Sequence, residues 1–135
     1  MQTVRRMNGD EALRFVKEWE QAWNVHDVER LLAHYTDDVI FQSPYIVYRF
    51  GEPTGEVRGK EALRRYWASG LEQLPTLRFS VEDLRLSVDT LVINYRNQDG
   101  HAISEVLRFR EGRVFWGCGA YQPGGALDAT RSLDH

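Results

Sequence analysis

The fold is decided by residues 91–121, LVINYRNQDGHAISEVLRFREGRVFWGCGAY, in which three strand patterns are separated by two turn signals. The strand patterns, rich in β-branched and aromatic side chains, lie at residues 91–97, 102–109 and 114–121. Asp99-Gly100 is a strong signal for a hairpin, and Glu111-Gly112 marks a second turn. The stretch therefore predicts three consecutive antiparallel strands.

Helices are predicted before this stretch. Asn8 or Asp10 can cap the first helix, and Asp27 can cap a short second one. The first helix carries apolar side chains near the helical period, at Ala12, Leu13, Phe15, Val16, Trp19, Ala22 and Trp23. The second helix carries Leu31, Leu32 and Tyr35 on one face. A third helix is expected to begin at Gly59 and to end near Pro75.

The remaining elements complete an α+β fold. A strand is predicted at residues 39–43, and Pro44 ends it. Residues 45–58 are expected to form an irregular loop, and residues 77–88 a loosely alternating strand. We therefore predict a curved antiparallel sheet wrapped around three N-terminal helices. Because the late strands are apolar on both sides, we also expect a homodimer through the outer face of the sheet.

Length and composition restrict the class of protein. The 135 residues fit a single domain at residues 1–122, followed by a flexible tail at 123–135. The net charge is −3 without a dense basic block, so a nucleic-acid partner is not expected. Cys118 is the only cysteine and the four histidines lack metal-ligand spacing, so we expect no disulfide, metal or cofactor. No signal peptide or membrane segment is recognisable, which predicts a cytoplasmic location.

Four motifs resemble the SnoaL-like branch of the nuclear transport factor 2 superfamily. They are WNVHD at 23–27, LLAHYTDDVIFQSP at 31–44, GKEAL at 59–63 and EVLRFREGRV at 105–114. The resemblance covers residues 10–122 and implies the cone-shaped fold. It does not fix the activity, because the superfamily contains isomerases, cyclases, dehydratases, epoxide hydrolases and non-catalytic binding domains.

The steroid isomerases of this superfamily allow a comparison of catalytic positions. Their aspartate base, just before the proline that ends the first strand, corresponds to Ser43. Their hydrogen-bonding tyrosine of the first helix corresponds to Trp19, and their protonated second acid corresponds to Glu105. The resemblance thus implies that one of three catalytic groups is retained, with a longer side chain.

Glu105 is the sharpest catalytic candidate. It shares a strand face with Ile103 and Leu107. A carboxyl between apolar neighbours has its pKa raised by desolvation, as a general acid near neutral pH requires. A two-residue turn at 99–100 would place Asn94 opposite Glu105 and Arg96 opposite Ile103. In the alternative interpretation, Glu105 is only a structural ion-pair partner of Arg96 or Arg108.

The face of strand 114–121 that lines the pocket depends on the second turn. A two-residue turn at 111–112 would bring Trp116, Cys118 and Ala120 to the side of Glu105. A three-residue loop with left-handed Gly112 would instead bring Phe115, Gly117, Gly119 and Tyr121 there. We favour the second arrangement, because its two glycines leave room for a cavity beside Glu105.

The candidate site therefore combines a few polar groups with many rings. Glu105, Ser43 and Asn94 are the predicted catalytic residues. The predicted ligand-binding residues are Trp19, Trp23, Tyr35, Phe41, Tyr45, Tyr66, Trp67, Arg96 and Leu107. We expect either proton transfer on a small, largely apolar molecule (isomerisation, cyclisation or dehydration) or a non-catalytic ligand-binding or dimerisation domain.

Overall fold

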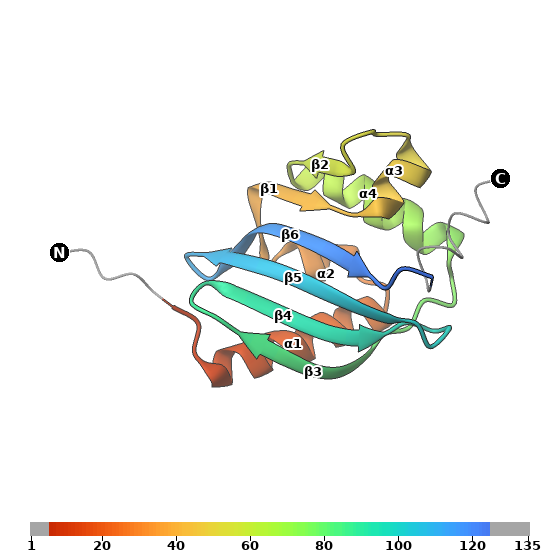
Figure 1. Ribbon diagram of the computed structural model, residues 1–135. Helices are drawn as coiled ribbons and strands as arrows, with labels where there is room; N and C mark the ends of the chain where they lie inside the picture. The colour runs from red at the N-terminus through yellow and green to blue at the C-terminus, as the bar shows by residue number, and fades with distance from the viewer. Residues whose placement is uncertain (1–5, 125–135) are drawn as a thin grey trace.

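The computed structural model describes residues 6–124, which form four helices and a six-stranded sheet (Figure 1). The elements are α1 (Gly9–Asn24), α2 (Val28–Leu32), β1 (Tyr35–Gln42), α3 (Pro44–Phe50), β2 (Glu56–Arg58), α4 (Lys60–Gln73), β3 (Ser80–Leu86), β4 (Thr90–Arg96), β5 (Ala102–Arg110) and β6 (Arg113–Tyr121). The predicted α+β class is confirmed. Most of the predicted tail, residues 125–135, lies outside the described residues.

The sheet has the strand order β2-β1-β6-β5-β4-β3. All neighbouring strands are antiparallel except β1 and β6, which run parallel. Figure 1 shows α1, α2 and α4 gathered on one face of this sheet. The outer face carries half-buried apolar side chains, among them Val92, Val106 and Trp116. The homodimer expected through this face stays a prediction.

The segment predicted as an irregular loop, residues 45–58, instead contains α3 and β2, so the chain has four helices rather than three. Pro44 occupies the first turn of α3, where a missing N–H is tolerated, and the Ser43 hydroxyl caps the helix. Gly51, with φ of 67°, ends it in the left-handed conformation. The strand-ending proline is thus also a helix start, which the sequence interpretation missed.

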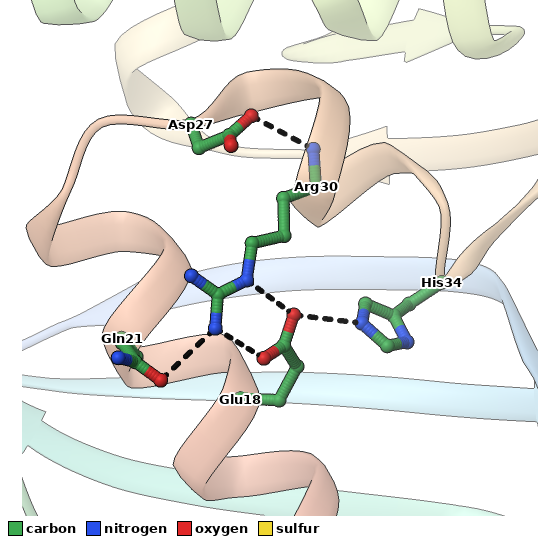
Figure 2. Close-up of polar contacts among 5 residues, drawn as sticks. All are labelled: Glu18, Gln21, Asp27, Arg30 and His34. Atoms are coloured by element: carbon green, nitrogen blue, oxygen red, sulfur yellow. Dashed lines mark hydrogen bonds and ion pairs between the residues drawn. The ribbon is translucent and has the colours of Figure 1, made fainter.

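The first two helices are joined by polar contacts (Figure 2). Asn8 forms a capping box with Glu11 at the start of α1, and Asp27 caps α2. Arg30 of α2 donates from Nε to Glu18 Oε2 at 2.7 Å and from Nη2 to Glu18 Oε1 at 2.5 Å. Figure 2 also shows His34, whose Nε2 lies 3.5 Å from Glu18 Oε2. The bidentate Arg30–Glu18 pair holds α2 against α1.

The β4–β5 hairpin has a three-residue loop rather than the predicted two-residue turn. The Asn97 N–H donates to the His101 carbonyl at 3.0 Å, and Gly100 between them has φ of 80°. A left-handed glycine at the third loop position is typical of this longer hairpin. The pairing consequently moves by one residue, and Tyr95 rather than Arg96 lies opposite Ile103.

The β5–β6 hairpin combines both alternatives. Its turn has two residues, Glu111 with φ of 53° and Gly112 with φ of 80°, as a type I′ turn requires. A bulge then follows, because Phe109 pairs with Val114 whereas Arg108 pairs with Trp116.

The bulge restores the favoured inward face beyond it. Gly117 lies opposite Leu107, Gly119 lies opposite Glu105, and Tyr121 completes the inward set. The expectation that Phe115 also faces inward is wrong. Its ring packs against the Arg108 and Arg110 guanidinium groups, at 5.2 and 5.1 Å from its centroid.

The glycine at position 117 is required by close packing, which gives a test of the β6 register. A Cβ there would lie 2.9 Å from Leu107 Cδ2 and 3.2 Å from Phe41 Cδ1. Gly117→Ala is therefore expected to lower the free energy of unfolding by about 1–3 kcal/mol in a urea titration. Gly9→Ala is the matched control, because a Cβ at Gly9 meets nothing within 4 Å. Equal stabilities of the two variants would contradict the register.

Candidate functional site

A cavity of about 300 Å³ lies inside the cone, between the sheet and α1, α3 and α4. Its deep wall is aromatic and is formed by Trp23, Phe41, Tyr66, Trp67 and Phe79. Polar residues of the β4–β5 loop and the end of α4 also line it, among them Asn97, Gln98, Asp99, His101 and Gln73. A pocket of this kind suits a small molecule with an apolar body.

Glu105 is the buried acid of this cavity. Its side chain projects from the centre of β5 and is only 5% exposed. Among residues 6–124 its only hydrogen-bond partner is Tyr95, whose hydroxyl donates to Oε1 at 3.3 Å. Burial raises the pKa of Glu105 to about 8, and the Tyr95 hydroxyl lowers it by a smaller amount. At neutral pH the carboxyl is therefore mostly protonated and can donate a proton.

A glycine of β6 leaves the position beside Glu105 open to the ring of Tyr121. Gly119 is paired with Glu105 in the sheet and presents no side chain. A Cβ at Gly119 would lie 3.3 Å from the Tyr121 hydroxyl oxygen, so the Tyr121 phenol covers this position. Burial raises the pKa of Tyr121, and the charges of Tyr66 and Glu105 raise it further. The glycine therefore brings a phenol to the region of the carboxyl.

Three phenols line the cavity together with the acid, Tyr66 and Tyr95 buried and Tyr121 half-buried, and all of them stay protonated at neutral pH. Burial raises the pKa of Tyr66 to about 12, and it raises the pKa values of Tyr95 and Tyr121 further above their ordinary range. The Ser43 hydroxyl interacts with Tyr66 and Tyr121 and opposes part of this shift in both. These O–H groups can donate hydrogen bonds to a ligand oxygen.

Ser43 caps helix α3 and also lines the cavity. Its side chain is 4% exposed, and its Oγ accepts the Tyr45 backbone N–H at 3.2 Å as the cap of α3. The hydroxyl also lines the cavity. Capping fixes the serine at the place where β1 gives way to α3 and holds its oxygen near the phenols.

The family model of the SnoaL-like domain matches residues 16–118, most of the chain. The chain belongs to the SnoaL-like domain family. A SnoaL-like protein of unknown function from Burkholderia thailandensis is 36% identical to this domain. The match covers 87% of this chain and 99% of that protein, with a TM-score of 0.83.

Two more distant structures share the fold of this SnoaL-like domain. AclR, a candidate hydroxylase from Streptomyces galilaeus, is 18% identical, with coverage of 93% and 99% of the two chains and a TM-score of 0.70. TerC, co-crystallised with polyporic acid, is 14% identical, with coverage of 91% and 97% and a TM-score of 0.72. No curated protein matches the chain.

The structure brings most of the predicted site residues of the domain together. The residues that line the cavity are Glu105, Ser43, Trp23, Phe41, Tyr45, Tyr66 and Trp67. Trp19, Tyr35 and Leu107 are fully buried behind this lining and do not reach the cavity. Trp19 stacks on Phe79 at 5.7 Å, and Tyr35 contacts Trp67 edge-on at 5.1 Å. These rings support the lining from behind.

The positions predicted for Asn94 and Arg96 are wrong, because the longer β4–β5 loop turns both side chains toward the outer face of the sheet. Asn94 donates to Asp83 Oδ1 at 2.6 Å and accepts from the Ser104 hydroxyl at 2.6 Å. Arg96 pairs with Glu82 at 3.1 Å and donates to the Gly100 carbonyl. Neither residue lines the cavity, so the predicted positions opposite Glu105 and Ile103 were wrong.

Sequence reasoning missed several lining residues. Tyr95 depends on the loop length, and a three-residue loop at the first turn would have revealed it. Tyr121 was predicted on the favoured inward face but was not named among the ligand-binding residues. Arg49 lies on the unpredicted helix α3, and His101 follows the β4–β5 loop.

The described part of the chain contains no cluster of three or more metal-ligating side chains. It also contains no helix long and apolar enough to cross a membrane.

The raised pKa of Glu105 predicts a stability signature that needs no ligand. Below about pH 4.5 the carboxyl is protonated in both states, but between about 4.5 and 8 it ionises only in the unfolded chain. The wild-type domain should therefore lose stability relative to Glu105→Gln as pH rises, by on the order of 4 kcal/mol between about pH 5 and about pH 8.5. Urea unfolding of both proteins at about pH 5 and about pH 8.5 measures this difference. A pH-independent difference would show that Glu105 is solvated or ion-paired.

Proposed function

We propose that this SnoaL-like domain binds a small, largely apolar molecule in the cavity and transfers protons on it with Glu105. It would act as an isomerase, cyclase or dehydratase that needs no cofactor. The observation that carries the proposal is the buried carboxyl with one phenol partner and a pKa of about 8. A group with a pKa near the working pH both gives and takes protons efficiently.

The surrounding groups suit a carbonyl substrate. In the proposed reaction the ionised Glu105 takes a proton from the carbon next to the carbonyl, and the electron pair moves to the carbonyl oxygen. Tyr66, Tyr121 or Ser43 donates a hydrogen bond to the resulting enolate oxygen. In a substrate whose β- and γ-carbons share a double bond, protonated Glu105 then returns the proton to the γ-carbon as the electron pair moves back, which gives isomerisation. In a substrate with a hydroxyl on the β-carbon, the returning electron pair expels that hydroxyl, which takes the proton from Glu105 and leaves as water.

A second function, non-catalytic ligand binding, is favoured by Ser43. The Ser43 hydroxyl is used as the cap of α3, and serine cannot replace the aspartate that steroid isomerases have at this position. In this case the cavity would hold its ligand unchanged. The relative TerC was co-crystallised with polyporic acid, and a bound cyclic ligand is compatible with either function.

Hydrogen–deuterium exchange on a probe ketone separates the two functions. The apolar cyclic ketone 2-tetralone has exchangeable hydrogens next to its carbonyl, and proton NMR in D₂O follows their loss. Wild-type protein is expected to accelerate this exchange, and Glu105→Gln is expected to reduce the acceleration roughly 100-fold or more, because glutamine cannot accept the proton.

Glu82→Gln is the matched control, since Glu82 is an exposed carboxylate paired with Arg96 on the outer face. It should exchange the probe at the wild-type rate. Equal acceleration by wild type and Glu105→Gln would refute the role of Glu105. Binding of 2-tetralone without any acceleration would favour the non-catalytic function.

A further inference from the structure

Arg49 lines the cavity from the last turn of α3. Its guanidinium carbon lies 5.5 Å from the centroid of the Tyr45 ring, within the range of a cation–π contact. Its Nη1 packs against the backbone of Gly70 in α4, since a Cβ at Gly70 would lie 2.8 Å from it. The guanidinium is thus held between an aromatic ring and a glycine at the cavity wall.

Arg49 is half-buried and has no ion-pair partner among residues 6–124. Two other arginines are half-buried, and both pair with glutamates: Arg30 with Glu18 at 2.5 Å, and Arg64 with Glu29 at 2.7 Å. Arg49 is also half-buried, but no carboxylate within residues 6–124 pairs with it. The remaining unpaired arginines of this part of the chain are exposed to solvent. A half-buried cation without a partner attracts an anion.

The ionisable neighbours do not supply that anion. Asp99 and His101 lie at the cavity edge, and the Asp99 carboxylate accepts a hydrogen bond from Gln98 at 3.2 Å. The charges of Arg49 and Glu105 act on the pKa of Tyr66 in opposite directions, since Arg49 lowers it and Glu105 raises it. The pKa of Glu105 is itself shifted by burial and by the Tyr95 hydroxyl, so Glu105 is not the counter-charge of Arg49.

We infer that Arg49 binds an anionic group of the ligand, so that the ligand class is an apolar ring compound with a single carboxylate. The planar guanidinium matches a carboxylate in a two-bond fork. The apolar body would then fill the aromatic part of the cavity and present its reactive carbon to Glu105. This inference rests on the proposed ligand-binding function and names the chemistry of its ligand.

A matched pair of fluorescent probes tests the inference. The anionic probe is 8-anilinonaphthalene-1-sulfonate, in which the sulfonate takes the place of the carboxylate. The neutral probe is N-phenyl-1-naphthylamine, which has the same rings without the acid. Fluorescence titration gives both dissociation constants. Wild-type protein is expected to bind the anionic probe about 10-fold more tightly than the neutral one.

Two variants should remove this preference by different routes. Arg49→Gln removes the charge, and Gly70→Ala displaces the guanidinium through the Cβ contact while suiting the helix. Each is expected to weaken the anionic probe about 10-fold and to change the affinity for the neutral probe less than about 2-fold. Retained binding of the neutral probe shows that the cavity is intact. Arg85→Gln is the control, because Arg85 is an exposed arginine on β3 outside the cavity.

The outcomes distinguish this inference from the proposed function. If both probes bind wild type equally, or if the variants weaken both probes alike, the role of Arg49 is overturned and the binding cavity stands. If neither probe binds wild-type protein, the proposed binding function and the inference are both overturned. A selective loss of the anionic probe in both variants, but not in Arg85→Gln, supports the inference.

Discussion

The site depends on the register in which β5 pairs with β4 and β6. This register decides that Glu105 points into the cone, with Tyr95 on the neighbouring strand and Gly119 directly opposite. A shift of one residue would exchange the two faces of a strand and bring Asn94 or Cys118 to the cavity instead. The left-handed Gly100 of one hairpin and the bulge after the other turn fix the pairing.

The same register explains why a carboxyl can stay buried at acceptable cost. Ionisation inside an aromatic cavity is unfavourable, so the group remains protonated to a higher pH and takes one hydrogen bond from Tyr95. The rings that exclude water from Glu105 are also the rings that would hold an apolar ligand. Desolvation of the acid and affinity for the apolar part of the ligand thus have one structural cause.

Much of the fold was predictable from local sequence patterns. The capped helices, the strands of the meander and the burial of Glu105 follow from periodicity and turn residues. Helix α3 was not, because Pro44 reads equally as the end of a strand and as the first residue of a helix. The lengths of the two hairpin loops could not be fixed from the sequence, since Asp-Gly and Glu-Gly occur in both loop types. A two-residue loop in the first hairpin would have placed Asn94 and Arg96 in the site, and assuming it concealed Tyr95.

The central claim is that Glu105 is a desolvated, protonatable carboxyl inside a ligand cavity. Carboxyl-carbon NMR titration measures it most directly, with Glu105→Gln identifying the resonance. We predict a pKa of about 8 for Glu105 in the wild-type domain and a higher pKa in Tyr95→Phe, because the Tyr95 hydroxyl stabilises the ionised form. A pKa at or below the ordinary value of 4.5 would mean that the group is solvated or ion-paired, and it would contradict the account.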